Sequence, residues 1–417
     1  MSKLPKQSPF YQELEQRCKH EGGVFFLDNE QEALAILEPG FARQVNAENY
    51  ADLTLPDKLS DTLKGKSGCP FSWAEIRDSW FKSLHGHVQL DNLQQLFDEM
   101  CRLIEKRIDQ ELDLVVFAQE VIARSLLPVI IAELPDKAHA LILADQNLKI
   151  CPFTKEQPEP ENFWQSVRGA MTQIRAGSAV RRELRARAKG TRPRQEDLLD
   201  PIVDMLPRLG IDRAVDAVTM ILTAIAGPPG ASASCLLYEL CTNEEWQQKV
   251  CDELKEISPQ ALFAAPTKVA PVTHRFVKEI LRHWSPPVIT TREVRTDINI
   301  NPKHWQQAKT LKPGQEYVFS SYFIHHDPEH WPEPDKFDPD RFLPGAANGP
   351  KNRGSYVPFG WAPKACVGQT LGTYQLIIFA YLMATRYQVH LKDPEKVSMA
   401  LAAMPLPLNF KGEIRRL

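Results

Sequence analysis

Near its C-terminal end the chain carries the run Tyr356-Val357-Pro358-Phe359-Gly360-Trp361-Ala362-Pro363-Lys364-Ala365-Cys366-Val367-Gly368. A phenylalanine stands seven residues before the cysteine, and a glycine stands two residues after it. A cysteine binds iron as its thiolate, so it needs a rigid loop that directs backbone N–H groups at the sulfur. Gly368 allows the backbone to approach closely, and the Phe359 ring can shield the sulfur from water. The run therefore predicts a metal-binding loop, against the alternative that Cys366 is a buried structural thiol.

Two further motifs precede this loop in the chain. Glu279 and Arg282 are three residues apart, a spacing that puts both side chains on one face of a helix, where they can pair. The segment Trp331–Phe342 brings a third charged residue, Arg341. In this order and spacing the three motifs resemble those of the cytochrome P450 family. The resemblance covers roughly residues 205–415, and the first half of the chain follows the family only in length and general pattern.

The resemblance implies a mainly α fold with small β-sheets, formed as a single domain over residues 1–417. It implies haem b between a kinked central helix and the cysteine loop, with Cys366 as the axial thiolate and Glu279, Arg282 and Arg341 as a charge cluster behind the loop. The other expected cofactor contacts are Phe359, Lys364, Gly368 and Arg292, with Lys82 and His85 near a helix that would contact the propionates. For Lys82 and His85 a solvated helix face is the alternative.

The run Ala226-Gly227-Pro228-Pro229-Gly230-Ala231-Ser232 departs from the family pattern. At the catalytic positions Gly227, Pro229 and Gly230, the family usually has a glycine, an acid and an alcohol. An acid and an alcohol can relay protons to bound oxygen, and proline and glycine side chains cannot. Adjacent prolines also kink a helix and release the carbonyls about four residues earlier. The alternative is that the helix ends here and another begins at Ser232.

The expected substrate pocket follows from position in the family pattern. Its residues are Ala226, Gly230, Val288, Ile289 and Met404, and each could equally belong to the core. These residues are uncharged, so they indicate a hydrophobic substrate without an obligatory charged partner.

Composition narrows the class of protein. The 417 residues are 43% hydrophobic, enough for a large core, and the net charge of −3 gives no global attraction to nucleic acid or membranes. The eight cysteines form no Cys-x-x-Cys pair, which favours reduced thiols in the cytoplasm. The polar segment Met1–Glu21 does not resemble a signal peptide, and no run of about 18 apolar residues predicts a membrane span.

One segment is strongly basic. Nine cations occur with Glu183 as the single acid between them: Arg168, Arg175, Arg181, Arg182, Arg185, Arg187, Lys189, Arg192 and Arg194. Such a run can attract an acidic carrier protein or an anionic substrate, although a solvated helix and linker is the simpler interpretation. Nucleic-acid binding is excluded because the run has no interleaved aromatic residues and no recognition motif.

Periodicity predicts the principal elements. Helices are expected over Leu93–Ile108, Leu114–Leu127, Asp212–Ile225 and Asn243–Ile257, the last with Asn243 as its cap. Strands are expected at Gly23–Leu27, Val288–Val294, Tyr317–Ser320 and Gln388–Leu391, and loops at Cys151–Glu161 and Pro344–Gly354.

The function that the resemblance implies is a bacterial haem-thiolate monooxygenase. It would hydroxylate or oxidatively couple a hydrophobic small molecule in specialised metabolism, with electrons from a ferredoxin and its reductase. A peroxide-using or hydroperoxide-rearranging relative is the first alternative, because Pro229 and Gly230 remove the usual proton relay. A non-catalytic haem-binding protein is the second.

Overall fold

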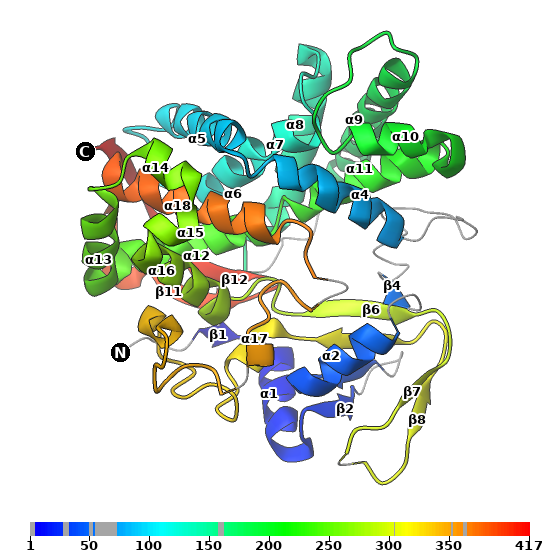
Figure 1. Ribbon diagram of the computed structural model, residues 1–417, viewed down its shortest axis with the longest axis vertical. Helices are drawn as coiled ribbons and strands as arrows, with labels where there is room; N and C mark the ends of the chain where they lie inside the picture. Colours follow the sequence, from blue (N-terminus) through cyan, green and yellow to red (C-terminus); the bar gives the residue numbers. More distant parts are fainter. Residues whose placement is uncertain are drawn as a thin grey trace. The chain divides into compact units, whose positions relative to one another are not determined.

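The computed structural model describes residues 5–27, 33–49, 53–54, 73–156, 162–303, 305–351, 353–361 and 365–417. This part of the chain is mainly helical with small β-sheets, which confirms the predicted fold class (Figure 1). The chain divides into two compact units. The first comprises Met1–Thr62, Arg275–Cys366 and Ser398–Pro405, and the second comprises Leu63–His274, Val367–Val397 and Leu406–Leu417. That all of it acts as one domain stays a prediction.

A five-stranded sheet organises the first unit. Its order is β2 (Val24–Phe26), β3 (Leu34–Ile36), β9 (Glu316–Phe319), β6 (Thr290–Val294) and β4 (Leu53–Thr54). The β3 and β9 strands are parallel, and the other pairs are antiparallel. Because successive side chains point to opposite faces, Tyr317 and Phe319 join one buried cluster and Val318 joins another. The sheet is therefore covered on both faces.

Short elements complete the first unit. They are α1 (Pro9–Glu21), α2 (Pro39–Glu48), α17 (Ser321–His325), the hairpin β7 (Ile298–Ile300) and β8 (Lys309–Leu311), the strands β1 (Lys6–Gln7) and β11 (Ser398–Leu401), the first residue of β12 (Pro405–Leu408), and residues 275–283 of α16 (Pro271–His283). Single 3₁₀ turns occur at η2 (Pro339–Phe342) and η3 (Arg353–Ser355).

The second unit is built from helices around α12 (Pro228–Thr242). α12 packs along α6 (Leu114–Ser125) and against α18 (Gln369–Thr385), whose all-round apolar sequence suits a buried helix (Figure 1). The remaining helices are α4 (Trp73–Gly86), α5 (Leu90–Glu105), α7 (Leu127–Ile130), α8 (Asp136–Ile150), α9 (Phe163–Ala188), α10 (Asp200–Leu209), α11 (Ile211–Ala224), α13 (Glu244–Leu254), α14 (Pro259–Ala264) and α15 (Pro266–Val269).

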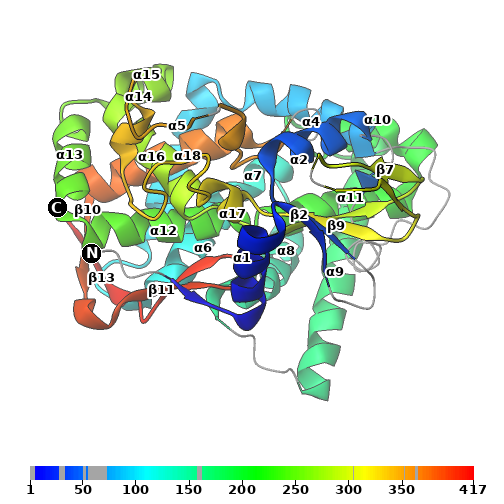
Figure 2. The same ribbon diagram turned by 90° about the horizontal axis from the view of Figure 1, so that it is seen from below.

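Long α9 runs beside α8 (Figure 2). A three-stranded antiparallel sheet of order β10 (Tyr387–Leu391), β13 (Lys411–Arg416) and β5 (Glu111–Asp113) also belongs to the second unit. The 3₁₀ turns here are η1 (Cys151–Thr154) and η4 (Pro394–Lys396).

The predicted elements are found with shifts of a few residues at their ends. The helix predicted after Asn243 is α13, and the Asn243 side chain accepts the Trp246 N–H at 3.3 Å, as expected for a cap. The segment predicted as a loop at 151–161 begins with the 3₁₀ turn η1, and residues 157–161 lie outside the described part of the chain.

The central helix is interrupted rather than kinked. α11 ends at Ala224 and α12 begins at Pro228, so the two prolines occupy the first helical positions, where a missing N–H costs nothing. A new helix thus begins here, but at Pro228 and not at Ser232.

The expectation that no stretch is apolar enough to span a membrane needs one correction. Residues Ile211–Thr242 together pass that test by length and composition, although 67% of their most apolar window is buried within the protein, as in any core helix.

Candidate functional site

Glu279 forms the centre of a buried charge cluster in the first unit. Arg282 Nε and Nη2 donate to the two Glu279 carboxylate oxygens at 2.8 and 2.9 Å, and Arg341 Nε donates to Oε1 at 3.1 Å. The Asp338 N–H donates to the same oxygen at 2.8 Å. All three charged side chains are fully buried. The structure thus brings together the residues that the sequence placed in one cluster.

Backbone carbonyls bind the remaining guanidinium N–H groups. Arg282 donates to the carbonyls of His325, Pro334 and Lys336, and Arg341 donates to those of Pro332, Glu333, Lys336 and Asn348. Two cations face one carboxylate, and burial lowers the pKa of Arg341. The carbonyl dipoles compensate for the excess positive charge. Through these hydrogen bonds the cluster holds the segment Pro332–Asn348 against α16.

His325 is a contributor that sequence reasoning missed. It is fully buried, its Nδ1 lies 3.1 Å from the Arg282 carbonyl oxygen, and its Nε2 accepts the Val357 N–H at 2.8 Å. Burial and the nearby Arg282 charge hold the pKa of His325 well below its ordinary value, so the ring is neutral. A neutral ring can donate through Nδ1 and accept through Nε2, which joins the charge cluster to the cysteine loop. No motif marks this histidine in the sequence.

A backbone hydrogen bond joins the two ends of the cysteine loop. The Cys366 N–H donates to the Phe359 carbonyl at 2.8 Å, and Gly360 has a φ of 72°, a left-handed conformation that glycine adopts without strain. Trp361 anchors the loop, since its indole N–H donates to the Gly354 carbonyl at 3.1 Å. The Cys366 side chain is exposed. Lys364 lies outside the described residues, and Gly368 caps the N-terminus of α18.

Arg292 offers an anion site in the first unit. It lies on β6 opposite Tyr317, and its Nη1 donates to the neighbouring Thr291 carbonyl at 2.9 Å. Burial lowers the pKa of Arg292, and within the described ranges no carboxylate forms an ion pair with it. A desolvated guanidinium without an anion is costly, so this side chain fits a ligand carboxylate such as a haem propionate.

A cavity of about 400 Å³ opens in the first unit. Its walls include Phe10, Tyr11, Ile289, Thr291, Glu316 and Met404. Two of the expected pocket residues, Ile289 and Met404, therefore share this cavity. Val288 does not: it is fully buried in the core, and its backbone N–H and carbonyl bond to Ala403 and Ser320.

The residues of the central run pack closely within the second unit. Ala226 is fully buried against Ala123 and Ile150. A β-carbon at Gly230 would lie 2.8 Å from the Gln119 Cα, so Gly230 marks a close approach of α12 to α6. That Ala226 and Gly230 line the substrate pocket stays a prediction. Gly227 is also buried, at the cap of α12, and Pro229 is partly exposed in its first turn.

Lys82 and His85 lie on the exposed surface of α4. In the same helix Trp80 is buried, and its indole N–H donates to the Leu198 carbonyl at 2.9 Å. Contact of Lys82 and His85 with a propionate stays a prediction.

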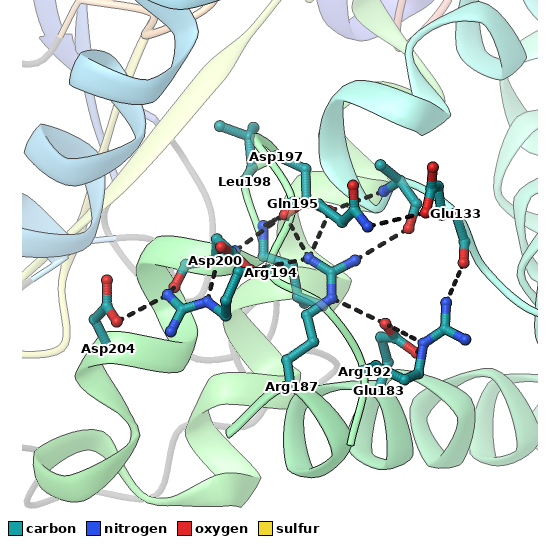
Figure 3. Close-up of polar contacts among 12 residues, drawn as sticks. Glu133, Glu183, Arg187, Arg192, Arg194, Gln195, Asp197, Leu198, Asp200 and Asp204 are labelled. Atoms are coloured by element: carbon teal, nitrogen blue, oxygen red, sulfur yellow. Dashed lines mark hydrogen bonds and ion pairs between the residues drawn. The ribbon is translucent and has the colours of Figure 1, made fainter. Parts of the chain in front are cut away.

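Much of the basic segment is neutralised within the second unit (Figure 3). Arg187 is fully buried and donates to Glu183 at 2.9 Å, to both Asp197 oxygens at 2.8 Å and to Asp200 at 3.1 Å. Arg192 also pairs with Glu183, Arg181 pairs with Asp212, and Arg194 pairs with Asp200 and Asp204. All of these acids except Glu183 follow the run in the chain, so the sequence overstated the charge. The exposed cations that remain are Arg168, Arg175, Arg182, Arg185 and Lys189.

Comparison with known proteins agrees with this geometry. A family model described as cytochrome P450 matches residues 194–411. The chain is 28% identical over 178 residues to cytochrome P450 4A10 of Mus musculus, and 27% identical over 180 residues to taurochenodeoxycholic 6 alpha-hydroxylase of Sus scrofa. Each match covers 42% of this chain and 33% of the relative, so the chain matches about a third of the length of these curated relatives.

Solved structures match over the whole chain. The retinoic acid-bound cyanobacterial CYP120A1 superposes with a TM-score of 0.78 at 16% identity, over 100% of both chains. The haem domain of cytochrome P450DA superposes with a TM-score of 0.74 at 16% identity, over 98% of this chain and 93% of that one. At such low identity these likenesses establish the fold.

Proposed function

Because the chain belongs to the cytochrome P450 family, whose members hold haem on an axial cysteine thiolate, we propose that Cys366 is that ligand and that the protein oxidises a hydrophobic small molecule. The observation that carries the proposal is the loop itself. It presents an exposed thiol, closes through the Cys366–Phe359 hydrogen bond and is braced by His325 and the charge cluster. Haem so bound supplies oxygen activation, because the thiolate donates electron density to the iron.

The chain's own residues have three roles in this proposal. Arg292 binds a propionate, since its desolvated guanidinium meets no carboxylate among the described residues. Glu279, Arg282 and Arg341 keep the cysteine loop rigid through His325. Ile289 and Met404 form part of an apolar wall that excludes water from the substrate, in a cavity where Thr291 and Glu316 supply polar groups.

The finer assignments are those that the sequence suggests. We propose hydroxylation or oxidative coupling in bacterial specialised metabolism, with electrons from a ferredoxin and its reductase. An acidic carrier protein remains a candidate partner at the exposed cations of α9. A cytoplasmic location is supported by the cysteines, which are thiols throughout the described residues.

A peroxide-using relative is the second candidate. Pro229 has no ionisable group, and Gly230 has no side chain and packs against α6. Neither can deliver a proton, and hydrogen peroxide brings its own two protons to the reaction.

Replacing the ligand tests the proposal. The reduced carbonyl complex of the wild-type protein should show the red-shifted absorption band for which the family is named, and Cys366→Ala or Cys366→His should lose it. Cys151→Ala is the control, because Cys151 is also exposed and lies on a 3₁₀ turn of the second unit. A band that persists in the Cys366 variants would refute the assignment.

Turnover then separates the two candidates. A library of hydrophobic compounds should be tested in parallel with ferredoxin, reductase and NADPH, and with hydrogen peroxide alone. Product with the first system supports the monooxygenase, and product with peroxide alone supports the second candidate. A thiolate spectrum without product in either system would favour a non-catalytic haem protein.

A further inference from the structure

A group of large apolar side chains is exposed on α9. Phe163 is 72% exposed, Trp164 74%, Ile174 68% and Met171 47%. The rings of Phe163 and Trp164 contact each other edge to face, with their centroids 5.4 Å apart. The surfaces of soluble proteins rarely gather large apolar side chains in one place unless that place binds something.

The helix that carries this group is well formed from its first turn. Asn162 Oδ1 accepts the Gln165 N–H at 2.9 Å, and Gln165 Oε1 accepts the Asn162 N–H at 2.8 Å, so a capping box fixes this end of α9. No residue from Phe163 to Arg175 is buried, and this half of α9 extends beyond the helices beside it (Figure 2). The apolar group is therefore presented on a preformed, protruding helix.

Basic side chains continue the same side of α9. The four apolar side chains lie within an arc of about 100° around the helix axis. The exposed cations lie in or beside that arc, three of them farther along the helix: Arg168, Arg175, Arg182, Arg185 and Lys189. Glu183, the only acid in the sequence of α9, lies on the opposite, buried side and pairs with Arg187. The outer face of α9 thus has an apolar half, a basic half and no acid from its own helix.

We propose that the outer face of α9 binds the surface of an anionic lipid bilayer. The apolar half enters the headgroup region, where tryptophan and phenylalanine rings are favoured, and the arginines bind lipid phosphates. The net charge of −3 does not oppose this binding, because the cations are concentrated on one face. The inference goes beyond the proposed function, since membrane binding requires no turnover.

The shape of this face favours a bilayer over a protein partner. The 26 residues of α9 form a rod about 39 Å long, and the outer face of a rod is convex. A flat, deformable bilayer contacts such a rod along its whole length, whereas a protein would need a groove that is apolar at one end and acidic at the other. Four of the five exposed cations are arginines, whose planar guanidinium groups match phosphate better than an ammonium group does.

Vesicle flotation with the holoprotein tests the proposal. The protein should partition at least about tenfold more strongly into phosphatidylcholine vesicles with about one third phosphatidylglycerol than into pure phosphatidylcholine vesicles. Salt at about 1 M, which shortens the Debye length to about 3 Å, should weaken the binding to the anionic vesicles at least about tenfold. Equal partition into the two kinds of vesicle, or none into either, would overturn the proposal. These measurements use the wild-type protein, so they do not depend on how a variant folds.

Substitutions separate the two halves of the face. Phe163→Ser with Trp164→Ser should lower the partition coefficient at least about tenfold, because two aromatic side chains no longer enter the headgroup region. Changing Arg182, Arg185 and Lys189 together to glutamine should lower it about a hundredfold, at about fivefold for each cation. An unchanged partition coefficient in either variant would contradict the role of that half.

Matched controls alter exposed side chains elsewhere in the second unit. Phe81→Ser with Leu90→Ser removes exposed apolar side chains of α4 and α5. The charge control changes three exposed lysines to glutamine: Lys106, Lys137 and Lys411. Both controls should bind the anionic vesicles as the wild type does. A control that weakens binding as much as the matching α9 variant would show that the contact is not specific to this face.

An acidic protein is the competing occupant of this face. Soluble polyglutamate imitates the charge of such a protein and offers no apolar interface. At an equal concentration of negative charge, polyglutamate should leave most of the holoprotein on the anionic vesicles. Complete displacement would show that charge alone binds to this face, and it would overturn the assignment to a bilayer.

Discussion

His325 accepts the backbone N–H of Val357 at 2.8 Å, and this hydrogen bond joins the charge cluster to the segment that leads to Cys366. The same imidazole lies 3.1 Å from the Arg282 carbonyl through its other nitrogen. Both contacts require a neutral ring with its proton on Nδ1. A second proton on the ring would break the hydrogen bond with Val357. The loop that presents the thiol is thus positioned by a histidine that must stay neutral.

Acid should therefore destabilise the protein through histidines. Burial holds the pKa of His283 and His325 well below the ordinary value and that of His326 at about 3. The unfolded chain binds these protons near pH 6.5, and the folded chain does not. The free energy of unfolding therefore has its full value above that pH and decreases as the pH falls below it. Three such groups give a slope of at most about 4 kcal/mol per pH unit.

Denaturant unfolding between pH 8 and pH 5 measures this slope. His326→Asn removes one of the three groups, so it should reduce the slope by about one proton. A stability that is flat across this range would contradict the neutral histidines.

Loss of the central carboxylate should be severe. Glu279→Ala leaves Arg282 and Arg341 buried without an anion, at an expected cost of about 3–5 kcal/mol. Thermal unfolding and the haem content of the purified protein are the readouts, and most of the variant should be misfolded or free of haem. Glu245→Ala removes an exposed carboxylate that pairs with Lys249, and it should change stability by no more than about 0.5 kcal/mol. Equal behaviour of the two variants would mean that the cluster contributes no more than a surface pair.

A methyl group at position 230 should not be tolerated. Gly230→Ala forces the new carbon against the Gln119 backbone, an overpacking expected to cost about 1–3 kcal/mol. Adding Gln119→Ala should recover only part of this loss, because the contact with the Gln119 Cα remains. Gly169→Ala on α9 is the control: nothing lies within 4 Å of its added carbon, so the change should stabilise by about 0.5–1 kcal/mol. A stable Gly230→Ala variant would show that α6 and α12 are farther apart.

The buried guanidinium of Figure 3 should be needed for folding rather than for docking. Arg187→Ala leaves Asp197 buried without its cation and Glu183 with Arg192 alone, which should cost about 3–5 kcal/mol in chemical denaturation. Arg182→Ala, in the same helix but exposed, should leave stability within about 0.5 kcal/mol. If both variants unfold at the same denaturant concentration, the network does not stabilise the second unit.

Sequence alone predicted the parts of the site that depend on local spacing. Glu279 and Arg282 face each other because they are three residues apart on a helix, and Asn243 caps α13 because its side chain reaches the next turn. The loop around Cys366 was recognised from residue types at fixed separations. Such features need no knowledge of what packs around them.

The features that depend on tertiary packing could not be predicted. After a break at two prolines, the sequence no longer determines which side of the next helix faces the core. It therefore did not show that Ala226 and Gly230 face α6. His325 belongs to no motif, and only its distant neighbour Val357 gives it a role. The charge of the basic segment was overestimated for the same reason, because Arg187 finds Asp197 across a turn of the chain.

The pairing of β13 with β5 has a consequence for synthesis on the ribosome. Lys411 pairs with Asp113, although most of the polypeptide separates them. At about 5–20 residues per second, β5 waits for tens of seconds before its partner strand is translated. During that interval its backbone edge can pair with other nascent chains, so chaperone supply and translation rate should influence how much of this protein reaches the native state.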